Sequence, residues 1–144
     1  MKELITEMKV TLASVFSFYL KTHNYHWNVT GPDFAQYHDF LGKLYEEVWD
    51  SVDLYAEHIR TLNSYAPGSL GRFSELSLIA DETTIPSGVS MMSKLAQDNS
   101  IILEQLYKTV SLAEMEGKRG IINFLEGQID YHDKLAWMLS SFNK

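Results

Sequence analysis

Apolar residues recur along most of this chain at intervals of three and four, which is the spacing of one face of an α-helix. The first such stretch covers residues 4–27, with apolar side chains at 4, 5, 8, 12, 15, 16, 19 and 20. Similar stretches cover residues 34 to about 63, a segment from near Pro86 or Ser87 to 116, and 121–142. No segment alternates convincingly with the period of two that a half-buried strand requires. The pattern predicts an all-α protein with four long helices.

Helix-breaking residues separate these stretches. The three prolines, Pro32, Pro67 and Pro86, each stand beside glycine or serine, and "GKRG" interrupts the chain at 117–120. Between the second and third long helices lies a long connection with one short amphipathic piece, "LGRFSEL" at 70–76. Four long helices with this crossover favour a ferritin-like four-helix bundle. The length of 144 residues predicts one domain spanning 1–144.

The second long helix carries two distinct stripes of side chains when its residues are placed about 100° apart. The first stripe is predicted to face the bundle core: Tyr37, Leu41, Leu44, Val48, Val52, Tyr55, Ile59 and Leu62. The second stripe mixes polar, aromatic and small residues: His38, Gly42, Tyr45, Trp49, Asp53, Ala56, Glu57 and Arg60. A tryptophan and a tyrosine are unusual on a solvent face, so we expect another subunit to cover this stripe.

Composition narrows the possible functions. The chain has no cysteine, which excludes disulfides, zinc–thiolate sites and iron–sulfur clusters. A net charge of −7 and the absence of a basic tail argue against general nucleic-acid binding. No apolar run approaches the length of about 18–20 residues that spans a bilayer. The start "MKELITEMKV" does not read as a signal peptide, and we expect a cytoplasmic protein.

Two pairs of potential metal ligands involve the second long helix: three of the four residues lie on it, and the fourth lies at the end of the first helix. His26 and His38 flank the turn "NVTGPD", which can fold one helix end back beside the next helix start. Asp53 and Glu57 are four residues apart, so their carboxylates share a face. His38 precedes Asp53 by 15 residues, about 22 Å along a helix, so one chain cannot bring both pairs to one ion. Two copies of the helix packed antiparallel about a twofold axis near residues 45–48 would join them.

The simpler interpretations of these residues stay open on the spacing alone. The histidines could be ordinary polar residues at a helix junction, and the two acids could be solvated or could form interface salt bridges with Arg60. Glu-x-x-His occurs nowhere in the chain, so the intrachain di-iron site of full ferritins is not expected.

The run "HWNVTGPDFAQYHDFLGKLYEEVWDSVDLYAEHIRTL" resembles the Dps family of mini-ferritins, in the spacing His-x11-His-x14-Asp-x3-Glu. "YAPGSLGRFSEL" is similar to the family's short helix, and "LAWMLSSF" to its C-terminal signature. The resemblance implies a hollow shell of twelve subunits that binds Fe(II) at dimer interfaces through His26, His38, Asp53 and Glu57. It also implies oxidation of that iron, preferentially by hydrogen peroxide, and storage of ferric mineral inside. Zinc or manganese could substitute at such a site. Trp27 matches a family tryptophan near the site that can intercept a stray electron.

Two departures from the family pattern qualify this expectation. Gly42 stands where the family usually has an aspartate, which removes one carboxylate, and Glu46 is the better placed of the nearby acids to help. Lys118 and Asn123 occupy positions where carboxylates would line the iron-entry pores. The alternative function is therefore a structural or DNA-associated shell with a weakened metal site, although the charge makes DNA binding unfavourable.

The remaining histidines and aromatic residues are given packing or surface roles. His23 and His58 are expected at the surface. No other potential metal ligand stands at a suitable spacing from His132, so a position lining a pore or an inner surface is not favoured for it. The aromatic residues expected to pack in the protein interior are Phe16, Phe18, Tyr19, Tyr25 and Trp137.

Overall fold

The computed structural model describes residues 1–144 and contains five helices and no strand. The helices are α1 (Lys2–Asn28), α2 (Phe34–Thr61), α3 (Leu70–Leu76), α4 (Gly88–Met115) and α5 (Arg119–Ser141). This confirms the all-α bundle with a short helix in the long connection. The observed bounds differ from the expected ones by at most two residues, and α5 already begins within "GKRG".

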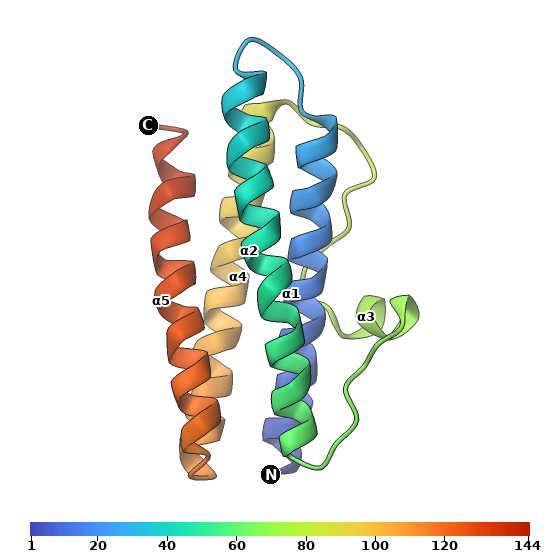
Figure 1. The fold of residues 1–144 in the computed structure, drawn as a ribbon, viewed down its shortest axis with the longest axis vertical. Coiled ribbons are helices and arrows are strands. Elements are labelled where there is room, and N and C mark those ends of the chain that lie inside the picture. The colour runs from blue at the N-terminus through green and yellow to red at the C-terminus, as the bar shows by residue number, and fades with distance from the viewer.

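The four long helices lie side by side, as Figure 1 shows. α1 and α2 run antiparallel, a crossover then carries the chain back along the bundle, and α4 runs parallel to α2 before α5 returns. α3 stands on the outer side of α1 and packs against it. The two halves of the bundle meet mainly where α1 packs against α4.

Local signals at the helix ends explain where the elements stop. The Ser87 hydroxyl accepts a hydrogen bond from the Ser90 amide and caps the start of α4. At the end of α4, Gly117 has a φ of +65°, and the Lys118 amide donates to the Ala113 carbonyl at 3.0 Å. This is the Schellman arrangement, in which a left-handed glycine lets the chain reverse its direction.

One continuous apolar core fills the bundle, with contributions from all four long helices. Most of the predicted core stripe of α2 is fully buried, including Leu41, Val48 and Tyr55, whereas Tyr37 and Val52 are only partly buried. Trp137 does not pack in the core, contrary to the expectation, because 67% of its surface is exposed. None of the helices is long and apolar enough to cross a membrane.

Candidate metal centre

The turn after α1 brings two histidines into contact. His26 lies in the last turn of α1 and His38 near the start of α2, and the five residues between the helices include Gly31 with a φ of +114°. The two imidazole rings stack with 3.8 Å between their centroids and 16° between their planes. Phe34 stacks on His38 with 4.9 Å between centroids. The sequence places these histidines on either side of a turn, and the fold makes them a stacked pair.

Each histidine of this pair is held by the backbone of the other. His26 Nδ1 lies 2.7 Å from the His38 carbonyl oxygen, and His38 Nδ1 lies 2.8 Å from the His26 carbonyl oxygen. A carbonyl oxygen can only accept a hydrogen bond, so both Nδ1 atoms must carry the proton. The Nε2 atom of each neutral ring therefore keeps its lone pair, and neither has a hydrogen-bond partner in the chain. The arrangement presents two nitrogen donors suited to a borderline divalent cation.

The second pair, Asp53 and Glu57, is exposed one helical turn apart further along α2. Protonated Glu57 can donate a hydrogen bond to the Asp53 carboxylate, and this bond together with the negative charge of Asp53 raises the pKa of the Glu57 carboxyl above its ordinary value. The Asp53 carboxylate disfavours the ionised form of Glu57, and a cation placed between the two carboxylates would offset this repulsion. About 22 Å of helix separates Asp53 from His38. No group of three or more histidine, aspartate or glutamate side chains in one chain is placed to hold a metal ion.

Apolar side chains surround both pairs on the face formed by α1 and α2. Trp27 is 60% exposed beside His26, and Trp49 is 50% exposed between the two pairs. A hollow of about 440 Å³ adjoins the acidic pair and is lined by Trp49, Asp50, Val52, Asp53 and Ala56. Large exposed aromatic side chains next to charged residues are typical of a surface that a partner covers.

A third histidine, His23, was expected at the surface; it is partly buried and packs against aromatic side chains in the same region. The His23 ring lies between Tyr45, whose ring is 3.7 Å away and nearly parallel, and Trp27 at 4.0 Å. His23 Nδ1 also shares a hydrogen bond of 2.9 Å with the Tyr19 hydroxyl. Burial, with a smaller effect of His26, lowers the pKa of His23. The spacing of 19, 23 and 27 on one face of α1 was a sequence signal for this cluster.

The other two histidines also have packing partners. His132 is fully buried, and its Nδ1 lies 2.6 Å from Asn99 Oδ1. His58 is partly buried rather than exposed, with its ring 4.6 Å from that of Phe124. In both cases burial lowers the pKa, for His132 to about 4.

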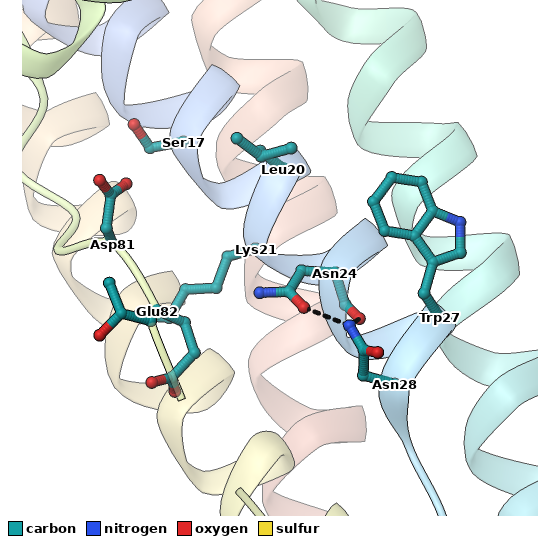
Figure 2. A pocket seen from close by; sticks show the side chains of 9 residues that line it. Ser17, Leu20, Lys21, Asn24, Trp27, Asn28, Asp81 and Glu82 are labelled. Atoms are coloured by element: carbon teal, nitrogen blue, oxygen red, sulfur yellow. Dashed lines mark hydrogen bonds between the residues drawn. The ribbon is translucent and has the colours of Figure 1, made fainter. Parts of the chain in front are cut away.

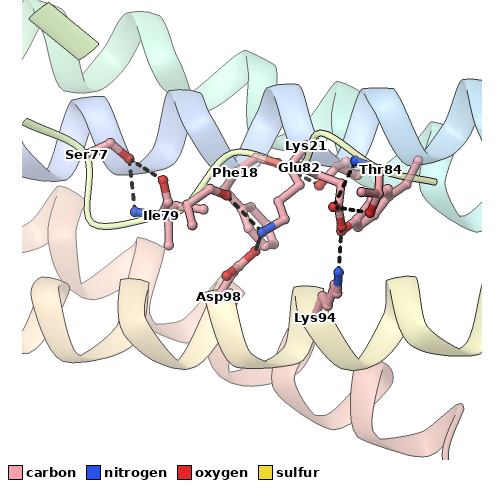
Figure 3. A network of polar contacts seen from close by, with 11 residues as sticks. Phe18, Lys21, Ser77, Ile79, Glu82, Thr84, Lys94 and Asp98 are labelled. Carbon is pink, nitrogen blue, oxygen red and sulfur yellow. Dashed lines mark hydrogen bonds and ion pairs between the residues drawn. The ribbon is translucent and has the colours of Figure 1, made fainter. Parts of the chain in front are cut away.

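A polar network that the sequence did not indicate anchors the crossover (Figure 3). Lys21 Nζ donates to the Ala80 carbonyl at 3.0 Å and lies 2.9 Å from Asp98 Oδ2, a contact of charges without hydrogen-bond alignment. The effect of burial on Asp98 is larger than the effect of the positive charge of Lys21, so the pKa of Asp98 is raised.

Glu82 forms the second part of this network. It accepts hydrogen bonds from Lys94 and from the Tyr25 hydroxyl, and these bonds lower its pKa to about 2. The network fixes the segment before α4 against α1.

Other hollows lie outside the histidine and acid pairs, and two of them concern the crossover and the α4–α5 turn. One of about 460 Å³ separates α1 from residues 81–83, and in Figure 2 Asn24 and Asn28 are joined by a hydrogen bond along its wall. The other is lined by His58, Lys118 and Arg119 at the α4–α5 turn. Two of its lining side chains, Lys118 and Arg119, are basic and none is a carboxylate, and the role of this turn in iron entry stays a prediction.

Comparison with known proteins decides the family. A family model for the ferritin-like domain matches residues 6–144. The structure superposes on the crystal structure of Dps from Staphylococcus aureus with a TM-score of 0.96 at 28% identity, covering 100% of this chain and 97% of that one. The chain belongs to the ferritin-like family and is a mini-ferritin of the Dps type. Membership in this family supports a role in iron storage and protection.

Two other relatives agree with this placement. The crystal structure of Dps from Vibrio cholerae, described as a member of a superfamily of ferritin-like diiron-carboxylate proteins, has a TM-score of 0.96 at 29% identity. It covers 99% of this chain and 90% of that one. A low temperature-induced protein of Nostoc is 33% identical over 141 residues, covering 96% of this chain and 79% of the relative. The diiron-carboxylate superfamily implies ferroxidase-type oxidoreductase chemistry in general.

Proposed function

We propose that this mini-ferritin oxidises Fe(II) at sites shared between two copies of the chain and stores the ferric product inside a closed shell. Each site takes His26 and His38 from one copy and Asp53 and Glu57 from the other. The observation that carries this proposal is the reciprocal clamp of the two histidines, which leaves both Nε2 lone pairs free. A histidine with only a structural role at the helix junction would not require a second histidine beside it that also carries its proton on Nδ1.

The distance between the two pairs makes the partner subunit necessary. Two copies of α2 packed antiparallel, crossing near residues 45–48, place His38 of one copy opposite Asp53 and Glu57 of the other. The crossing then lies beside Tyr45 and the exposed Trp49. Burial of such aromatic surface is the usual driving force of a twofold interface. Repetition of this dimer gives the closed assembly, which we propose contains twelve subunits.

The ligand set suits the oxidation of iron. Two imidazoles and two carboxylates bind Fe(II) as substrate, and the two negative charges favour the ferric state over the ferrous one. Two Fe(II) ions each lose one electron, and one hydrogen peroxide takes up both electrons and two protons to give two water molecules. Peroxide and ferrous iron are thus consumed together, which limits damage by hydroxyl radicals. Zinc or manganese can occupy the same ligands.

Mixing two inactive variants tests the shared site. His38→Ala and Glu57→Ala each remove one half, so shells of either variant alone should show background rates of peroxide-dependent Fe(II) oxidation. In shells assembled from equal amounts of both, random pairing leaves about a quarter of the sites intact, so about a quarter of the activity should return. His58→Ala and Glu47→Ala, on the same helix but outside the site, serve as matched controls and should remain active. Full activity in either single variant, or no recovery on mixing, contradicts the proposal.

The alternative of a DNA-associated shell makes a different prediction. The net charge of −7 opposes binding to phosphates, so supercoiled DNA should show no gel shift at physiological salt. A shift that weakens steeply with added salt would instead support this alternative.

A further inference from the structure

Three aromatic side chains on the α1–α2 face, Tyr45, Tyr19 and Trp49, form a row that runs from the histidine pair to the acidic pair of the same chain. The ring centroid of Tyr45 stands 5.2 Å from that of His26, and the ring centroid of Tyr19 lies 6.2 Å from that of Tyr45. Trp49 follows at 4.9 Å from Tyr19 and lines the same hollow as Asp53. This aromatic row therefore connects the two pairs of potential metal ligands that one chain carries.

His23 adds a proton acceptor to the middle of the aromatic row. Its ring stacks on Tyr45 with 3.7 Å between centroids and 9° between planes, and its Nδ1 lies 2.9 Å from the Tyr19 hydroxyl oxygen. When the ring carries its proton on Nε2, Nδ1 accepts the hydrogen bond that the phenol donates. A phenol that loses an electron becomes a strong acid, so a base in hydrogen-bond contact makes its oxidation easier. Tyr19 has such a base in His23.

The proposed shared site needs a second source of electrons. Two imidazoles and two carboxylates are ligands for one Fe(II), which supplies one electron, whereas complete reduction of hydrogen peroxide to water takes two. Reduction by one electron alone breaks the O–O bond into hydroxide and a hydroxyl radical. In the twofold arrangement, the histidine pair of a chain belongs to one site and its acidic pair belongs to the other. The aromatic row of each chain therefore links two sites, and each of them binds an Fe(II).

We propose that the aromatic row, with His23 as its proton acceptor, carries an electron between the two metal sites of a dimer. This inference rests on the proposed shared site. Where peroxide binds, Fe(II) gives one electron and Tyr19 gives the second, while the phenolic proton of Tyr19 moves to His23 Nδ1. The peroxide O–O bond breaks, and two protons from solvent complete two water molecules. Fe(II) at the other site then reduces the Tyr19 radical, and the proton returns from His23.

The electron balance is measured in shells that hold one Fe(II) per proposed site, with limiting peroxide and an excess of a spin trap. Native shells should oxidise two Fe(II) per peroxide and release little hydroxyl radical to the trap. Tyr19→Phe keeps the ring but loses the phenol, so the ratio should fall from two toward one and the spin-adduct signal should rise. Tyr107→Phe, at an exposed tyrosine of α4, is the matched control and should behave as the native protein. A ratio of two without a spin adduct in Tyr19→Phe overturns the proposal.

The radical intermediate is measured by freeze-quench electron paramagnetic resonance. When Fe(II) fills a small fraction of the sites, the linked site is mostly empty, so peroxide should leave a long-lived tyrosyl radical in native and Tyr107→Phe shells. Tyr19→Phe should lose this signal, and filling all the sites should shorten its lifetime. His23→Phe removes the proton acceptor and should lower the radical yield. An undiminished signal in Tyr19→Phe or in His23→Phe, or a lifetime that does not depend on the Fe(II) loading, overturns the proposal.

The shared site and the electron bridge fail in different ways. If mixed His38→Ala and Glu57→Ala shells recover activity while Tyr19→Phe keeps the ratio of two and gives no spin adduct, the shared site stands and the bridge is wrong. If mixing recovers no activity while Tyr19→Phe still loses the radical signal, the shared site is wrong. The bridge between sites then falls with it, although Tyr19 is oxidised.

Discussion

Histidines at the α1–α2 junction and in the bundle core make the same kind of hydrogen bond from Nδ1, but the consequence differs between the two places. His26 and His132 both donate from Nδ1 to an amide oxygen, of His38 and Asn99 respectively. At the junction the ring is partly exposed, and Nε2 has no partner. In the core the ring is 1% exposed, and burial lowers its pKa to about 4. The hydrogen bond sets the tautomer in both places, but burial decides whether the imidazole can meet a cation or only fill space.

Truncation of the two rings should separate these roles most strongly. His132→Ala leaves a cavity and an unpaired Asn99 oxygen in the core, so the free energy of unfolding should fall by about 3–5 kcal/mol. His26→Ala removes a ring from a partly exposed junction and should cost about 1 kcal/mol. Urea unfolding at one fixed protein concentration measures both, because the stability of an oligomer depends on concentration. Similar losses in the two variants would remove the distinction between the regions.

The dependence of stability on pH should carry a signature of the core histidine, His132. The unfolded chain protonates His132 near pH 6.5, whereas the native state resists protonation until about pH 4. The native state therefore loses stability as the pH falls through this window, by up to about 3 kcal/mol from this group. His132→Asn keeps a donor for Asn99 but cannot titrate, so its unfolding free energy should fall less between pH 7 and pH 4.5. Parallel pH profiles for the two proteins would contradict this assignment.

His23 offers an intermediate case between the junction and the core. His23→Ala removes the ring between Tyr45 and Trp27 together with the Tyr19 hydrogen bond, and should cost about 1–2 kcal/mol. His23→Phe keeps a ring in the stack and loses only the hydrogen bond, so it should retain more of the stability. Thermal unfolding of both variants checks this order, and the reverse order would show that the hydrogen bond dominates.

The smallest effect is expected at the acidic pair. Asp53 raises the pKa of Glu57, so the ionised pair is unfavourable, and this cost grows as the pH rises through the ordinary glutamate value. Glu57→Gln should therefore raise the Tm of the metal-free protein slightly at pH 7 and have no effect near pH 3. The same variant should lose Zn(II) binding in titrations. A lower Tm at pH 7 would show that Glu57 has a stabilising partner instead.

Much of the architecture could be read from the chain. The helical period located all four long helices, and the prolines and glycines between them marked the breaks. "LGRFSEL" was correctly assigned as a short helix at 70–76. These features depend on local backbone preferences and on the face that each helix must bury, and both are written in neighbouring residues. The placement of His26, His38, Asp53 and Glu57 as one shared centre stays a prediction.

Contacts between helices could not be derived in the same way. The period of α1 could not show that His23 stacks on Tyr45 of α2, or that Asn99 of α4 fixes the tautomer of His132. Trp137 was expected to pack in the protein interior because it is a large aromatic residue, and yet it lies at the surface. A periodic pattern describes one helix by itself, and several partner arrangements satisfy it equally well.

Gly42 shows the difference between what the local sequence indicates and what contacts between helices decide. From the chain alone, a glycine among potential ligands indicates only a missing carboxylate. The fold places the His26 ring against it, because the turn after α1 returns the chain at one particular distance and angle. The order of residues determined which helices form and which donors are available, since these follow from local propensity and burial. Tertiary packing alone decided which donors face each other and in which tautomer, since that depends on atoms far apart in the chain.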